Sequence, residues 1–127
     1  MGETRHSQLS AQLNLAEPRF VELHKRIDGS WTLVDSVSII DGAYTFRGLV
    51  EEPTLARMWV HAECVRFVSV ILERGAIKVL TNANWKSTIT GTRNNNIRQP
   101  FLDAEFVIQQ RINETSRAFD QAQQDED

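Results

Sequence analysis

The chain contains a single cysteine, Cys64, which is the first candidate for redox or metal chemistry. One cysteine excludes an internal disulfide, a Cys-x-x-Cys redox pair and a cysteine-based zinc site. A reactive thiolate needs positive surroundings and exposure, and only Arg66 is a nearby cation in the sequence. We therefore interpret Cys64 as a small packing residue, buried or half-buried.

The three histidines, His6, His24 and His61, are far apart and show no metal-ligand spacing. If His24 and His61 lie on neighbouring strands, they could form a site together with Glu22 or Glu63. Partly exposed strand histidines are the favoured interpretation. The sequence thus predicts no metal and no cofactor.

Asp35 and Ser36 are of the residue types found in a Ser-His-Asp hydrolytic triad, but the sequence places no histidine beside them. An aspartate near a strand end more often accepts hydrogen bonds from backbone or side-chain donors. We therefore interpret this pair as structural and predict no catalytic residue.

Three tryptophans could form a stacking surface for a ligand. Trp31 and Trp85 lie beside turn residues, so we expect them at a ligand or partner surface. Trp59 lies between Met58 and Val60 in a β-prone run, so we expect it in the core. If Trp31 and Trp85 both proved buried, a glycan-binding interpretation would be dropped.

The composition of the chain bounds its class. It has 127 residues and a net charge of −3, which fits one domain and argues against a nucleic-acid surface. No apolar run approaches the roughly 20 residues of a membrane helix, so no transmembrane segment is predicted. Residues 1–7 contain no apolar signal core, which leaves open a cytoplasmic protein or a leader that has been removed.

The dipeptide Asp41-Gly42 predicts a two-residue β-turn, because both central positions of a type I′ turn need positive φ. If it is the turn, the register of a hairpin follows. Tyr44 and Phe46 would then share one face with Ile39 and Val37. The predicted pairs are Ile40–Ala43, Ile39–Tyr44, Ser38–Thr45, Val37–Phe46, Ser36–Arg47 and Asp35–Gly48.

Short β-prone runs with turn signals continue to about residue 92, which predicts an antiparallel β-sandwich of about seven to nine strands. Residues 10–15 and 19–26 are expected to form a first pair. Residues 66–72 have almost no polar alternation, which is typical of a strand covered on both faces or of a buried central strand.

One amphipathic helix is predicted after the strands, because Phe101, Ile108, Ile112 and Phe119 recur at helical spacing. It could cap the sheet, or its distal half from Ile112 to Phe119 could pair with another protein or a second copy of the chain. The predicted segments are a disordered or expression-derived N-terminus (1–8), the sandwich (9–96), a linker-like helix (97–119) and an acidic disordered tail (120–127).

The order of these motifs resembles a Bacteroidetes family called domain of unknown function 4369. The resemblance is carried by Asp35-Ser36-Val37, by the Asp41-Gly42 turn with the strand that ends in Tyr44-Thr45-Phe46-Arg47-Gly48, and by the steps at Gly75 and Gly91. It covers roughly residues 10–115. The family has no established catalytic residues in this domain, so none is carried over.

The resemblance implies a small β domain at the N-terminus of an exported thiol-disulfide oxidoreductase, followed by a thioredoxin-like domain of the peroxiredoxin class. Such proteins are usually periplasmic, secreted or lipid-anchored. This chain would then be a non-catalytic accessory domain, with the redox centre elsewhere and the helix leading to the partner domain. The alternative is a stand-alone exported module that binds a glycan or a peptide, and a small enzyme acting alone is the least favoured.

Overall fold

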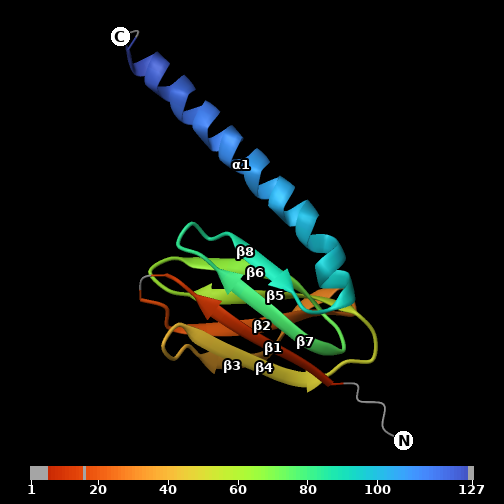
Figure 1. Ribbon diagram of the computed structural model, residues 1–127. Coiled ribbons are helices and arrows are strands. Elements are labelled where there is room, and N and C mark those ends of the chain that lie inside the picture. The colour runs from red at the N-terminus through yellow and green to blue at the C-terminus, as the bar shows by residue number, and fades with distance from the viewer. Residues whose placement is uncertain (1–5, 16, 126–127) are drawn as a thin grey trace, which may run out of the picture. The chain divides into compact units, whose positions relative to one another are not determined.

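The computed structural model describes residues 6–15 and 17–125, and shows eight strands followed by one long helix (Figure 1). The elements are β1 (His6–Leu13), β2 (Phe20–Ile27), β3 (Ser30–Ser38), β4 (Ala43–Leu49), β5 (Thr54–His61), β6 (Val65–Leu72), β7 (Gly75–Thr81), β8 (Ser87–Thr90) and α1 (Arg93–Asp125). The chain divides after Ile97 into two compact units. The sandwich with the first turn of α1 is therefore described separately from the rest of the helix.

The strands form two four-stranded sheets that stack face to face (Figure 1). Sheet A has the order β4-β1-β7-β8, and sheet B has the order β3-β2-β5-β6. The predicted β-sandwich with a C-terminal helix is thereby confirmed. One strand pair departs from the antiparallel prediction, because β1 and β7 run parallel, from Ser7–Gly75 to Leu13–Thr81.

Alternation along each strand builds the core between the sheets. In β1 the buried residues are Ser7, Leu9, Ala11 and Leu13, and the residues between them are exposed. Tyr44 is also buried, and its hydroxyl lies 3.7 Å from the sulfur of Met58. Burial raises the pKa of Tyr44 above its ordinary value. The largest apolar side chains with under 2% exposure come from both sheets: Leu9, Met58, Ile77, Ile89, Val21, Val60, Val70 and Val79.

The predicted turn at Asp41-Gly42 is confirmed. Asp41 has φ 53° and Gly42 has φ 75°, and the amides of Ile40 and Ala43 each donate to the other's carbonyl at 3.0 Å. The carbonyl of Gly42 also accepts from the amide of Leu13 at 2.7 Å, which ties the turn to the end of β1.

The register predicted beyond the turn is wrong, because β3 and β4 separate into different sheets after the Ile40–Ala43 bridge. Tyr44 pairs with Ala11 and Phe46 with Leu9, whereas Val37 pairs with Val21. The reason is burial. A two-stranded ribbon leaves one face of its aromatic residues in water, but the two-sheet corner buries Tyr44 and Phe46 to 4% and 3% exposure.

Two other pairing predictions are also wrong. Residues 10–15 and 19–26 do not pair, because β1 belongs to sheet A and β2 to sheet B. The apolar run at 66–72 is not a central strand, because β6 is an edge of sheet B. Its inner residues Val68, Val70 and Leu72 are buried, while Phe67 on the other face is 46% exposed.

The helix α1 begins at Arg93, four residues before the predicted start at 97, and continues to Asp125 through the segment 120–125 that was predicted to be disordered. At the other end, β1 begins at His6, inside the predicted disordered segment 1–8, whose first five residues lie outside the described part of the chain. The acidic tail residues 126–127 also lie outside it.

The early start of α1 has a clear cause in the carboxylate of Glu73, which directly follows β6. Its Oε2 accepts hydrogen bonds from the Thr92 hydroxyl (2.7 Å) and from the amides of Asn94 (2.9 Å) and Asn95 (3.2 Å). These amides belong to the first helical turn, so Glu73 acts as an N-cap supplied by another strand. The side chain of Asn95 bonds both backbone groups of Ile71 at the free edge of β6.

Glu73, Thr92, Asn94 and Asn95 together join the end of β6 in sheet B to the end of β8 in sheet A. We call this cluster the sealed edge. Gly91 makes it possible: its φ is 104°, and a Cβ there would lie 2.3 Å from the carbonyl oxygen of Ala76. The opposite edge, where β3 and β4 leave their common turn, is called the open edge.

Candidate functional site

The chemistry-bearing residues named from the sequence lie at several separate places in the sandwich. Cys64 is exposed in the turn between β5 and β6, so its expected burial as a packing residue is wrong. Asp35 accepts a hydrogen bond from the amide of Ser36 at 2.8 Å. Among the residues that the structure describes, no group of three His, Cys, Asp or Glu side chains is arranged to hold a metal ion.

A second group of side chains lies on the outer face of sheet B, the face turned away from sheet A. Six side chains, which we call the aromatic platform, project from positions that alternate with the core: Phe20, Trp31, Arg57, Trp59, His61 and Phe67. On β5, for example, Met58 and Val60 point inward with 0% exposure while Arg57, Trp59 and His61 point outward. The prediction that Trp59 is a core residue is therefore wrong, because it is half-buried on the outside.

Pairing across strands brings the platform together. Phe20 is opposite His61, and Trp59 is opposite Phe67. The Phe20 and His61 rings stack with centroids 4.1 Å apart, and the Trp59 and Phe67 centroids are 5.0 Å apart. Aromatic contacts across strands stabilise the sheet, but one face of such a layer still meets water.

Arg57 is the centre of the platform. Its guanidinium carbon lies 4.2 Å from the centroid of the Trp31 ring and 4.7 Å from that of Phe67. Cation–π contacts on both rings fix a long side chain that would otherwise be mobile. The outer face of sheet B therefore presents a pre-ordered cation among apolar rings.

A histidine–carboxylate pair lies at the rim of the platform. His61 Nε2 is 2.5 Å from Oε1 of Glu22, and both side chains are about one-quarter exposed. His24 instead contacts the edge of the Trp59 ring, with centroids 6.3 Å apart. Of the site considered from the sequence, the structure brings together only His61 and Glu22, because His24 contacts Trp59 instead and Glu63 is exposed in the β5–β6 turn.

The two tryptophans proposed as a ligand or partner surface are both half-buried, and a guanidinium lies over each ring. Arg57 lies over Trp31, and Arg66 lies 5.2 Å from the centroid of Trp85. Trp85 follows a turn closed by Asn82 and has a positive φ of 62°. Trp31 belongs to the platform, whereas Trp85 precedes β8 of sheet A.

The remaining residues singled out from the sequence are placed as follows. On the helical unit, Ile112 is 52% exposed and Phe119 is 62% exposed. Gly75 and Gly91 both have positive φ, at the start of β7 and just after β8. Gly48 is paired with Ser7 at the open edge.

Sequence reasoning missed Arg57, Phe67, Phe20 and His61 as members of one surface. A signal was present, because Arg57-x-Trp59-x-His61 and Phe20-x-Glu22-x-His24 place rings and charges two residues apart. This pattern was hard to recognise, because both faces of β5 contain apolar side chains, with Met58 and Val60 on the core face.

The fold and the platform together define a small β-sandwich domain with an apolar, cation-bearing outer sheet. The model of the family described as Domain of unknown function (DUF4369) matches residues 8–97. The chain belongs to this family.

Similar solved structures include the N-terminal domain of AlgF from P. aeruginosa, with 12% identity, a TM-score of 0.46, and coverage of 73% of this chain and 100% of that one. Sea bream transthyretin in complex with thyroxine is also similar, with 12% identity, a TM-score of 0.40, and coverage of 66% of this chain and 93% of that one. Likenesses this distant carry no inference about function. A search of curated proteins finds no match.

Proposed function

We propose that this chain is a non-catalytic accessory domain that holds a partner protein on the aromatic platform. The proposal depends on one observation: the Arg57 guanidinium contacts the rings of both Trp31 and Phe67 on the outer face of sheet B. Tryptophan, other aromatic residues and arginine are the types enriched at the energetic centres of protein interfaces. A side chain already fixed in place loses less entropy when a partner binds.

A protein partner is favoured over a sugar because of how the rings are used. Sugar stacking needs an open ring face, and a guanidinium lies over the rings of both Trp31 and Trp85. The flanking exposed groups are Phe20 and Phe67, at 37% and 46% exposure, which add apolar area suited to a protein surface.

The family resemblance suggests which partner this is. We propose the thioredoxin-like domain of an exported thiol-disulfide oxidoreductase, in the periplasm or outside the cell, with a lipid anchor in some members. The single cysteine of this chain supports that division of labour, since a Cys-x-x-Cys centre would have to come from the partner. The exposed stripe of α1, with Ile112 and Phe119, would provide a separate contact with a partner or pair with a second copy.

The test is a calorimetric titration of the purified chain with the thioredoxin-like domain of a family protein that contains one. We expect saturable binding, and we expect Arg57→Ala or Phe67→Ala to weaken it by about thirtyfold or more, as hot-spot truncations do. The matched controls are Arg47→Ala and Leu80→Ala, because these side chains are exposed on the outer face of sheet A, and Leu80 has almost the same exposure as Phe67.

Wild-type affinity in both platform variants would contradict the proposal. Binding of neutral oligosaccharides, with the same loss in the platform variants and no binding of the thioredoxin-like domain, would replace it with the glycan-binding alternative.

A further inference from the structure

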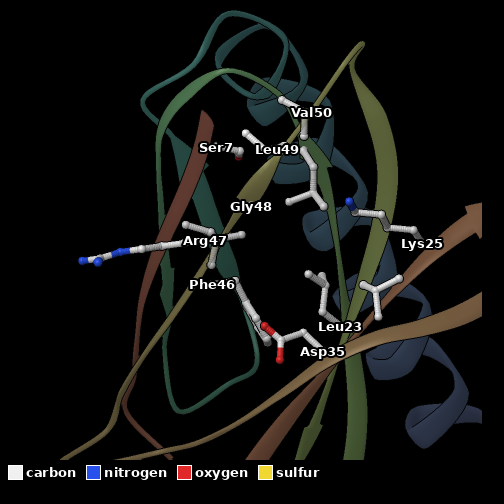
Figure 2. Close-up of a pocket in the computed structure, with 12 residues that line it drawn as sticks. Ser7, Leu23, Lys25, Asp35, Phe46, Arg47, Gly48, Leu49 and Val50 are labelled. Atoms are coloured by element: carbon white, nitrogen blue, oxygen red, sulfur yellow. The ribbon is translucent and has the colours of Figure 1, made fainter. Parts of the chain in front are cut away.

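A pocket of about 200 Å³ lies at the open edge, between the two sheets and separate from the aromatic platform (Figure 2). Its floor is apolar and includes Leu9, Leu23, Phe46 and Leu72, and its mouth includes Lys25 and Asp35. For scale, a dry apolar cavity of about 150 Å³ binds benzene. The pocket therefore has room for one small apolar group.

The pocket exists because the end layer of the core lacks side-chain volume. Ser7 and Gly48 are cross-strand partners in sheet A, and Ser7 points inward in step with Leu9. Among the described residues, a Cβ at Gly48 would have no heavy atom within 4 Å apart from its own chain neighbours. Where the next layer has Leu9 opposite Phe46, this layer has a hydroxymethyl group and a hydrogen atom.

On the facing sheet, charged residues occupy core-facing positions. Lys25 pairs with the buried Ala56, and Asp35 pairs with the buried Leu23, so both lie on the inner face of sheet B. A β-bulge at Val34 places Asp35 on this face, because the register shifts between Leu23 and His24 and leaves Val34 without a partner. Bulges re-aim side chains and are common beside binding sites.

These charges do not neutralise each other. Within the part of the chain that the structure describes, Lys25 and Asp35 form no ion pair, and Asp35 uses one oxygen for the amide of Ser36. Figure 2 shows the Lys25 ammonium turned toward Leu49, the Asp35 carboxylate turned toward Phe46, and the Arg47 guanidinium pointing away from the other labelled side chains. The mouth of the pocket thus presents one cation, Lys25, and one anion, Asp35, that are not paired with each other.

A buried polar atom also lines the pocket. The Ser7 hydroxyl oxygen is fully buried in a residue with 6% exposure, and it has no hydrogen-bond partner among the described residues. Leaving such a group unpaired is unfavourable, so native structures normally supply a partner. The unpaired hydroxyl agrees with a core layer that lacks side-chain volume.

We propose that this pocket binds a small zwitterion with an apolar side chain, that is, a free apolar α-amino acid. The side chain would enter between Leu9, Leu23 and Phe46, its carboxylate would meet Lys25, and its ammonium would meet Asp35. The ligand class follows from one apolar space of limited size and two unpaired opposite charges at its mouth. The proposal is independent of the partner surface on sheet B.

The test is an NMR titration of the ¹⁵N-labelled chain with L-leucine and L-phenylalanine. We expect saturable shifts of the Ser7 and Gly48 amides at millimolar ligand, whereas the single-charge analogues phenethylamine and 3-phenylpropionate bind about tenfold more weakly, because each lacks one charge-assisted contact. Lys25→Met and Asp35→Asn should each weaken binding by about tenfold, while Lys78→Met on the outer face of sheet A should bind as wild type.

Gly48→Leu fills the pocket directly and should abolish the shifts. The melting temperature of Gly48→Leu shows whether this variant folds. If Gly48→Leu is unfolded, Lys25→Met provides the independent variant. The absence of saturable shifts, wild-type binding by both charge variants, or equal binding of either single-charge analogue would each overturn the proposal.

Discussion

At one edge of the sandwich the ends of β6 and β8 are joined through a buried carboxylate, whereas at the other edge β3 and β4 are joined only at their common turn. Glu73 receives hydrogen bonds from Thr92, Asn94 and Asn95 at the sealed edge. At the open edge Ser7, Gly48, Lys25 and Asp35 face a pocket. Both edges thus contain polar residues at core-facing positions, and they differ in whether those residues satisfy each other.

Polar groups that bond one another at the sealed edge therefore stabilise the fold, whereas the unpaired polar groups at the open edge are available to a ligand. A fully satisfied network fixes the local structure and leaves no group free. Unpaired charges beside an apolar space contribute little to folding and remain available for binding. The comparison predicts that substitutions at the sealed edge mainly affect stability, whereas substitutions at the open edge mainly affect binding.

The largest effect is expected for Glu73→Ala. It removes the acceptor of two backbone amides and a buried hydroxyl, and each unsatisfied group costs roughly 1–3 kcal/mol, so we expect a loss of about 3–5 kcal/mol in the free energy of unfolding. Urea denaturation followed by tryptophan fluorescence measures it. Glu63→Ala, in the exposed β5–β6 turn, is the matched control and should change stability by less than about 0.5 kcal/mol. Equal stability of the two variants would contradict the role of the sealed edge.

A somewhat smaller loss is expected for Gly91→Ala. The new Cβ would lie 2.3 Å from the Ala76 carbonyl oxygen at a φ of 104°, so the substitution combines a clash with backbone strain. We expect a loss of about 2–4 kcal/mol by thermal unfolding. Gly29→Ala provides the control, because Gly29 has a φ of 80° but nothing within 4 Å, which isolates the strain alone at about 1–2 kcal/mol. A Gly91 variant no worse than the Gly29 variant would show that β7 and the loop after β8 can separate freely.

The opposite sign is expected for Gly48→Ala at the open edge. Its φ is not positive, and no heavy atom of the described residues beyond its chain neighbours would lie within 4 Å of its Cβ. The substitution therefore restricts the unfolded chain without a clash and should stabilise the fold by about 0.4–1 kcal/mol. The melting temperature of Gly48→Ala compared with wild type measures this effect. Destabilisation would mean that the pocket is already filled by neighbouring side chains in solution.

Features that depend on local contacts could be predicted from the sequence, whereas features that depend on distant contacts could not. The Asp41-Gly42 turn and the strand alternation depend on neighbouring residues, and both were predictable. The pairing of Phe46 with Leu9, and the capping of α1 by a glutamate about twenty residues earlier, depend on residues far apart in the chain. Period-two alternation shows which residues share a face, but it does not show which sheet a strand joins.

The candidate sites were harder to predict for a related reason. Trp31 was singled out because it follows a turn, but Arg57 and Phe67 become its neighbours only through the pairing of β2 with β3 and β5, and of β5 with β6. The pocket depends on a bulge at Val34, which moves Asp35 to the inner face of sheet B. No local pattern distinguishes that bulge from a regular strand.

The smallest effect concerns Tyr44, which lies in the core between the two edges and is the single tyrosine of the chain. Burial raises its pKa in the folded state, so the folded protein retains a proton that the unfolded chain loses near pH 10. The unfolded state then binds fewer protons, and stability decreases as the pH rises above about 10. Tyr44→Phe should remove this part of the alkaline destabilisation while costing about 1 kcal/mol or less at pH 7, because its weak contact with Met58 sulfur is lost. Absorbance of the phenolate at 295 nm reports Tyr44 alone. Ionisation of this tyrosine near pH 10, while the far-ultraviolet circular dichroism still shows folded protein, would contradict its burial.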